Sequence, residues 1–423
     1  MTSKNSFSKD AWSLDCKLMR EKLRHSLWAV SLFTLILFFA IPVPVIMGVQ
    51  NAIGLRGQVN YEARLENALR QIATFMSLEN FFIGIVAVAM AAVMATVAFR
   101  FMHSKKQVDF YHSLPVRRGH LFASNFLAGF LSFAGAYLVN LLIAVIIVAC
   151  SGYGKAIAMA HLGTAIPTHL VFFLVTYALC VVAHMLAGST ATGVLCSGVL
   201  LAVPPAAMGL YIVGMNRLFG NWYLPEAVIL KTLDRISPLW QYFSLAYNEE
   251  GNTAVILLCW LAVGLALTAL GGWLYRRRPS ECAGRAISFK IPAAVLKYIA
   301  VLLCTVAGGL FFDAIGVGVG WLFFGFVCGG VISHCIIEII YHADFKAIFS
   351  HIKGLAVFAL LFAVAYGALA ADVFHYDSFV PTADQVQSVS LQCPIFETYV
   401  DSNFMGYRQM EMDRLDRLTF DEP

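Results

Sequence analysis

Apolar residues in this chain gather in nine long runs, each separated from the next by a polar or turn-forming interval. About 20 consecutive apolar residues in an α-helix cross the hydrocarbon core of a bilayer, and runs of this length are typical of such spans. The pattern therefore predicts nine transmembrane helices. We expect them near residues 27–49, 79–99, 121–149, 164–187, 191–214, 252–275, 297–313, 318–341 and 354–373.

The composition excludes a soluble fold. Of the 423 residues, 60% are hydrophobic and only 13% are charged, and the mean hydropathy is +0.75. Average soluble domains are closer to half apolar and a quarter charged. The ten cysteines contain no C-x-x-C pair and mostly fall in or beside apolar runs, so we expect no disulfide framework. The chain is therefore predicted to be an all-α polytopic membrane protein.

The distribution of charge predicts the orientation in the membrane. With a cytoplasmic N-terminus, the inside segments contain 19 of the 29 Lys and Arg residues, and 18 of the 25 Asp and Glu residues lie outside. Cytoplasmic loops of membrane proteins carry an excess of Lys and Arg. We therefore expect a cell (plasma) membrane protein with a cytoplasmic N-terminus and an extracytoplasmic C-terminus.

Three of the intervals outside the predicted spans have a composition that predicts a structure of their own. Residues 1–26 place leucines near one helical face, which favours an interfacial helix over an ordinary basic flank. Residues 215–251 contain apolar stretches too short to span, which predicts re-entrant or interfacial helices on the outer side. Residues 374–423 are acidic, and we expect them to belong to an incomplete extracytoplasmic domain.

The interval at 100–120 is a short basic loop held between the second and third predicted spans. Ser104 can cap a short helix and Pro115 can end it, and apolar side chains lie among the charges between them. Aromatic and arginine side chains are common anchors in protein interfaces, so a partner protein could grip this helix. The alternative is a basic loop that only fixes the orientation in the membrane.

The segment SKKQVDFYHSLPVRRGHLF resembles the stretch between spans two and three of ABC-2 type exporter permeases. In that family a leucine–proline–x–arginine phrase follows a short coupling helix. The topology is similar to the type V exporter architecture over residues 1–278, with an elbow helix at 1–26 and a six-span core at 27–278. The three-span extension at 279–373 and the tail resemble a Gram-positive subgroup similar to Ytr-type and antimicrobial-peptide-export permeases.

This resemblance implies that the loop docks on a separate ATPase subunit and that a second permease is present, in a homodimer or as a sister permease. The residues that would contact the ATPase are Lys105, Lys106, Asp109, Phe110, Tyr111, Leu114, Pro115 and Arg117. The chain has no G-x-x-x-x-G-K-[ST] motif, so we expect ATP and Mg²⁺ on the partner and no cofactor in this chain. The sequence does not indicate nucleic-acid binding.

A second candidate site lies in the eighth predicted span. His334, Glu338 and His342 are spaced four residues apart and share one stripe of a helix. A carboxylate inside a membrane indicates function by default, and two imidazoles with a carboxylate suit a metal ion or a proton relay. Eight residues of helix cover about 12 Å, which is too far for one ion. The alternative is a Glu338 paired with a histidine or a neighbouring helix.

We therefore predict a membrane-spanning permease subunit of an ATP-binding-cassette exporter, which has no enzymatic activity of its own. It would couple ATP hydrolysis by the partner to movement of an amphiphilic cargo such as a peptide antibiotic, a lipid or a drug. The alternative is a membrane sensor or an intramembrane metal- or proton-dependent protein that uses His334, Glu338 and His342.

Overall fold

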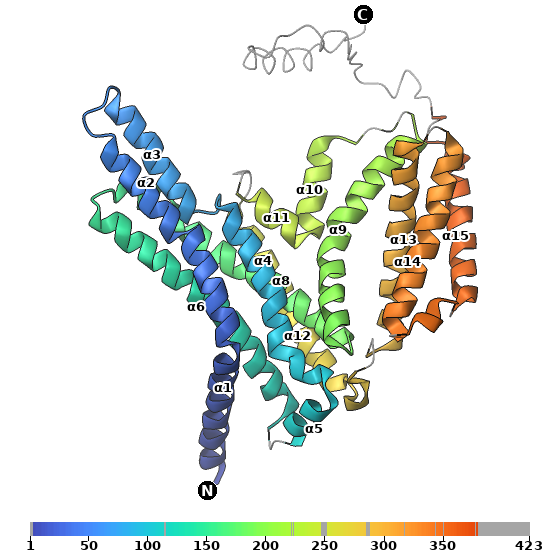
Figure 1. The fold of residues 1–423 in the computed structure, drawn as a ribbon, viewed down its shortest axis with the longest axis horizontal. Helices are drawn as coiled ribbons and strands as arrows, with labels where there is room; N and C mark the ends of the chain where they lie inside the picture. Colours follow the sequence, from blue (N-terminus) through green and yellow to red (C-terminus); the bar gives the residue numbers. More distant parts are fainter. Residues whose placement is uncertain are drawn as a thin grey trace, which may run out of the picture. The chain divides into compact units, whose positions relative to one another are not determined.

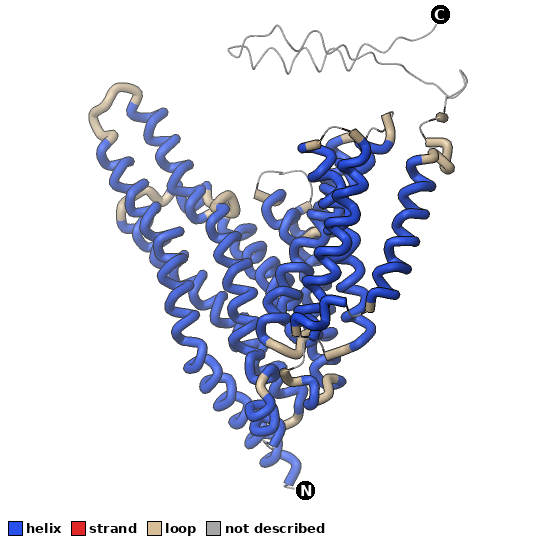
Figure 2. Tube along the Cα trace, turned by 45° about the vertical axis from the view of Figure 1, so that its right-hand side comes forward, coloured by secondary structure: helices blue, strands red, loops and turns tan. Residues whose placement is uncertain are grey.

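The computed structural model describes residues 3–113, 116–220, 222, 224–246, 252–284, 288–316, 318–342, 344–349, 351–376 and 378–379. Within these residues every element is a helix (Figures 1 and 2). Nine stretches of this part of the chain are helices long and apolar enough to cross a membrane. The predicted all-α polytopic membrane fold is confirmed.

The helices follow one another in this order along the chain: α1 Ser3–Ala40, α2 Pro42–Gly54, α3 Tyr61–Met76, α4 Phe81–Phe99, η1 Arg100–His103, α5 Lys105–Ser113, α6 Arg118–Cys150, α7 Lys155–Met159, α8 Leu162–Leu186, α9 Thr190–Leu218, α10 Glu226–Ile236, α11 Pro238–Ser244, α12 Thr253–Arg277, η2 Ser280–Cys282, α13 Lys290–Ile315, α14 Val319–His342, η3 Phe345–Phe349 and α15 Ile352–Ala370. Here η marks a 3₁₀ turn, which is common at helix ends. The helices end on two opposite sides of the bundle, and the side on which α5 lies is called the α5 end (Figure 1).

Contacts divide the chain into two compact units. The first contains residues Met1–Arg217 and Tyr223–Phe362, and the second contains Leu218–Trp222 and Ala363–Pro423. The predicted six-span core, apart from Leu218–Trp222, thus shares the first unit with the first two spans of the predicted extension, and the third predicted span is divided between the units. In the second unit the rings of Phe219 and Tyr376 lie 5.3 Å apart. The predicted acidic domain falls mostly at 380–423, outside the described residues.

The first helix differs from its prediction. α1 is continuous from Ser3 to Ala40, so residues 3–26 do not form a helix separate from the first span. The reason is that Ser3–Ala40 contains no Pro or Gly that would interrupt the backbone hydrogen bonds. The break comes only at Pro42, which begins α2 at a position where a missing N–H costs nothing.

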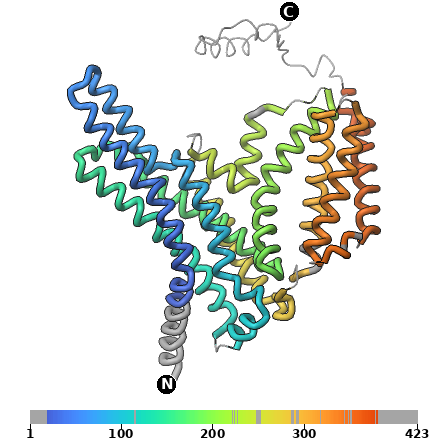
Figure 3. Tube along the Cα trace, in the orientation of Figure 1, coloured from blue at the N-terminus to red at the C-terminus, as the bar shows by residue number. Residues whose placement is uncertain are grey.

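Several helices extend beyond the length that a membrane requires. α6 has 33 residues, which is about 50 Å of helix against about 30 Å of hydrocarbon. α2 and α3 form a hairpin that packs on α6 and α7 away from the α5 end (Figures 1 and 3). The sequence analysis did not predict α3, an amphipathic helix whose buried residues are Ala68, Leu69, Ile72, Ala73 and Met76.

The predicted helices between spans five and six are present as α10 and α11. Ser237 begins α11 by accepting a hydrogen bond from the backbone N–H of Trp240 at 3.2 Å. α11 packs on α8, where the Tyr242 hydroxyl lies 2.5 Å from His169 Nδ1. Both groups are buried, so this contact fixes the segment to the bundle.

α13 and α14 form a closely packed pair, drawn in orange in Figure 3. A Cβ atom added to Gly308 would lie 2.7 Å from the carbonyl oxygen of Gly325, and Gly329 packs against the main chain of Cys304. Small residues that let helix backbones approach are the usual means of association within membranes, where water exclusion offers no driving force.

Candidate functional site

The short helix predicted between the second and third spans is present as α5, Lys105–Ser113, directly after the η1 turn. Ser104 lies between the two with an extended backbone, which ends one helix and begins the next. Leu114 and Pro115, the last two residues of the predicted helix surface, lie outside the described residues.

One face of α5 is fixed to the bundle. Val108 is buried, and the Tyr111 ring lies 4.7 Å from the Phe101 ring. Lys22 Nζ of α1 lies 4.0 Å above the Tyr111 ring, a cation–π contact that joins α1 to α5. Tyr111, predicted as part of the partner surface, is therefore half-buried and directed towards the chain's own helices.

His112 connects α5 to the segment after the sixth span. Its Nδ1 lies 3.2 Å from Ser280 Oγ, and its Nε2 lies 3.5 Å from the Tyr275 hydroxyl. Partial burial, together with the positive charge of Arg118, lowers the pKa of His112 below its usual value of 6.5. The contact therefore contains a neutral imidazole at neutral pH.

Arg278, which follows α12, is hydrogen-bonded to α8 and to the η1 turn that precedes α5. Its Nη1 donates to the carbonyl oxygens of His184 at 2.9 Å and Met185 at 3.3 Å, and its Nη2 donates to the Met102 carbonyl at 3.4 Å. Carbonyls in the last turn of a helix lack intrahelical partners, and a cation there also complements the helix dipole. Burial lowers the pKa of Arg278 to about 10. This residue joins the end of α8, the η1 turn and the end of α12.

The opposite face of α5 is open. Phe110 is 61% exposed, and Lys105, Lys106, Asp109 and Arg117 are exposed around it. An exposed aromatic ring among charges of both signs is a typical anchor for a partner protein. The predicted contact residues thus divide into an exposed group centred on Phe110 and the inward Tyr111, and the two adjacent rings, 5.5 Å apart, both line a cleft.

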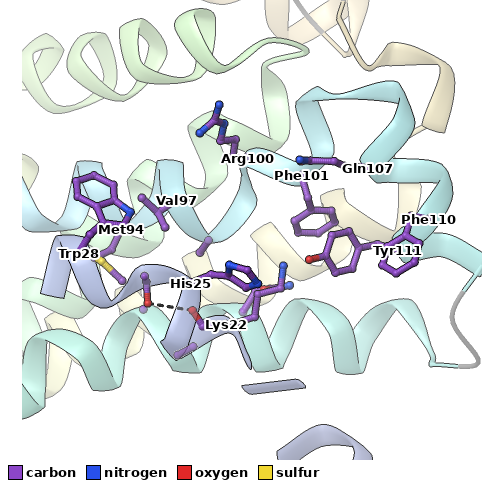
Figure 4. A pocket seen from close by; sticks show the side chains of 15 residues that line it. Lys22, His25, Trp28, Met94, Val97, Arg100, Phe101, Gln107, Phe110 and Tyr111 are labelled. Carbon is purple, nitrogen blue, oxygen red and sulfur yellow. Dashed lines mark hydrogen bonds between the residues drawn. The ribbon is translucent and has the colours of Figure 1, made fainter. Parts of the chain in front are cut away.

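A cleft of about 440 Å³ lies beside α5, between it and α1, α4 and α6 (Figure 4). Lys22, His25 and Arg100 contribute nitrogen-bearing side chains, and Trp28 and Met94 contribute apolar surface. At its α6 wall lies the buried Asn125, and its Oδ1 has no hydrogen-bond partner among the described residues. A cleft with basic groups and apolar walls suits a ligand that is both charged and apolar.

In the second candidate site Glu338 pairs with a neighbouring helix and with a histidine, as the alternative interpretation expected. Glu338 is only 2% exposed, and its Oε1 forms an ion pair with Lys297 Nζ of α13. His342 Nε2 lies 3.2 Å from Glu338 Oε2, but His334 Nε2 is 4.0 Å from the other oxygen. The third close group is His351, whose Nδ1 lies 3.4 Å from Oε2.

The sequence reading missed both Lys297 and His351. His351 lies 13 residues beyond Glu338, across the η3 turn, so a spacing rule for one helix cannot find it. Lys297 stands at the start of an apolar run, and a lysine there is itself a signal for a buried acidic partner on a neighbouring helix.

Comparison with protein-family models and with curated proteins finds no match for this chain, so the two sites described above rest on sequence and geometry alone.

Proposed function

We propose that this chain is the membrane-spanning permease subunit of an ATP-binding-cassette exporter, with α5 as the contact for a separate ATPase subunit. The observation that carries the proposal is the two-sided character of α5. Its outward face presents Phe110 among charges, and its inward face is fixed to the bundle by Val108, Tyr111 and His112. The phrase at 114–117 agrees in position with the permease family that the sequence resembles.

The fixed face gives a route for transmitting force. A push on Phe110 would pass through Tyr111 to α1, and through His112 to the segment that follows α12. Arg278 would carry the same displacement to the end of α8. Binding of ATP between two ATPase subunits would in this way favour one of two arrangements of the membrane helices, through contacts that differ between the arrangements.

The remaining parts of the proposal follow from this role. The α5 end and the N-terminus would be cytoplasmic and the C-terminus extracytoplasmic in the cell membrane. ATP and Mg²⁺ would bind to the partner, and a second permease, identical or a sister chain, would complete the pathway. The cleft of Figure 4 supports an amphiphilic cargo, because it combines Lys22 and Arg100 with the apolar surface of Trp28.

The proposal is tested by purifying the full chain from its native membrane in mild detergent and measuring ATP hydrolysis in the complex. We expect vanadate-sensitive hydrolysis that co-elutes with the chain and falls at least tenfold with Phe110→Ala. Phe345→Ala is the matched control, because Phe345 is also an exposed phenylalanine in a short helical turn between two spans. It should leave hydrolysis unchanged.

Two results would contradict the proposal. One is the absence of any co-eluting ATPase from a chain that still performs its transport. The other is a transport activity that survives Phe110→Ala but is lost with Glu338→Gln, which would favour the sensor or intramembrane protein that depends on Glu338.

A further inference from the structure

Three side chains meet at the α5 end of α14. Glu338 Oε2 lies 3.2 Å from His342 Nε2 and 3.4 Å from His351 Nδ1. Each residue offers one ligand atom, and the three atoms all lie within 4.8 Å of one another. The two imidazole rings are 5.8 Å apart and nearly parallel, with an interplanar angle of 12°. We propose that Glu338, His342 and His351 form a binding site for a divalent transition metal ion, with Zn²⁺ as the best fit.

The distances agree with the geometry of zinc. Zn²⁺ binds imidazole nitrogen at about 2.0–2.1 Å and carboxylate oxygen at about 2.0–2.2 Å, usually with four ligands in a tetrahedron. Two ligands of a tetrahedron with these bond lengths lie about 3.3–3.4 Å apart. The two distances from Glu338 Oε2 are already close to this value. Only the two imidazoles need to approach each other.

The two oxygens of Glu338 serve different partners. Lys297 pairs with Oε1, on the α13 side, and the imidazoles of His342 and His351 gather at Oε2. The ammonium therefore orients the carboxylate and leaves Oε2 for the metal, as hydrogen-bonding partners commonly do behind metal ligands. Its positive charge also opposes a second cation.

Access and chain geometry favour a site that opens to water. The side chains of His342 and His351 are 46% and 66% exposed, so an ion could reach them without crossing the bundle, and water could supply the fourth ligand. His351 has φ of 56°, a left-handed backbone that residues other than glycine seldom adopt. This conformation places its imidazole over Glu338. A bound metal would tie the end of α14 to the residue that precedes α15.

The test is a titration of the full-length chain in detergent with Zn²⁺ against a fluorescent chelator, and with Co²⁺ monitored by visible absorption. We expect one ion per chain and an intense tetrahedral Co²⁺ spectrum. His342→Ala and His351→Ala should each weaken binding about tenfold or more and abolish that spectrum.

His161→Ala is the matched control. His161 is exposed, has φ of 45° and precedes α8 as His351 precedes α15, but it lies outside the cluster. His161 and His351 are both exposed and can be replaced without opening the core. Gel-filtration profiles check that each variant is folded. Absence of saturable binding, or equal affinities for wild type, His351→Ala and His161→Ala, would overturn the inference. The titration needs no ATPase, so its outcome is independent of the exporter proposal.

Discussion

Replacing Arg278 by alanine is the sharpest test of how the η1 turn, which leads into α5, is joined to the membrane helices. The guanidinium of Arg278 is buried and donates to three carbonyls, those of His184, Met185 and Met102, at 2.9, 3.3 and 3.4 Å. No other residue contacts the end of α8, the η1 turn and the end of α12 in this way among the hydrogen bonds of the described residues. The Arg278→Ala variant loses all three bonds at once.

The expected magnitude follows from the quality of these bonds. A hydrogen bond from a charged group contributes about 1.5–3 kcal/mol, and we assign this to the 2.9 Å bond. The two longer bonds contribute about 0.5–1 kcal/mol each. Removal of a buried cation recovers part of this loss, because its desolvation no longer opposes folding. We therefore expect Arg278→Ala to lower the free energy of unfolding by about 2–4 kcal/mol.

The assay is denaturant unfolding in detergent micelles, followed by tryptophan fluorescence, with Arg277→Ala as the control. Arg277 is the adjacent residue and is exposed, and its guanidinium lies 5.4 Å from the Trp273 ring. Such an exposed cation–π contact is worth about 0.5–1 kcal/mol. The free energy of unfolding of Arg278→Lys should fall between those of Arg277→Ala and Arg278→Ala, because an ammonium group cannot reproduce the planar, forked hydrogen bonding of a guanidinium. Equal stabilities of the Arg277→Ala and Arg278→Ala variants would refute the reasoning.

Three further changes test other contacts. Gly329→Leu should cost about 2 kcal/mol or more in the same unfolding assay because a side chain there meets the main chain of α13, whereas Gly198→Leu, in open space, should be tolerated. Lys297→Met should cost about 3–5 kcal/mol by leaving Glu338 buried without its ammonium, and adding Glu338→Leu should restore most of the loss; a double variant as unstable as the single one would contradict this. Because the pKa of His112 is lowered, the unfolded chain binds more protons below pH 6.5, so α5 should lose stability as the pH falls from 7.5 to 5.5; hydrogen exchange of α5 should show this in the wild type and much less in His112→Gln, and identical profiles would argue against it.

Much of the fold could be predicted from the sequence because continuous apolar runs are sufficient to define spans. The hairpin helix α3 was not predicted, since its apolar residues cover only one face and its charged residues resemble a loop. The start of α1 was predicted to be a separate interfacial helix because its leucines lie near one helical face. In the structure α1 is one continuous helix, because no Pro or Gly before Pro42 interrupts its backbone hydrogen bonds.

The candidate sites were predictable only where they are local. Ser104 and Pro115 predicted a short helix, and α5 confirms it over the described residues Lys105–Ser113. Which of its side chains face outward depends on Ser280, 168 residues away from His112, and no pattern within α5 contains that information. Glu338 is divided in the same way: its contact with His342, four residues later on α14, was predicted, whereas Lys297 of α13 and His351 beyond η3 were not.

The length of α6 has a mechanical consequence. This single helix begins at Arg118, immediately after the α5 loop, and ends at Cys150 beside α7. A straight rod of about 50 Å that tilts by about 5° about one end moves its other end by about 4 Å. A small tilt of this helix at its α5 end would therefore move the α2–α3 hairpin, which packs on its other part, by several ångströms, and a fluorophore pair attached to the hairpin could measure that displacement.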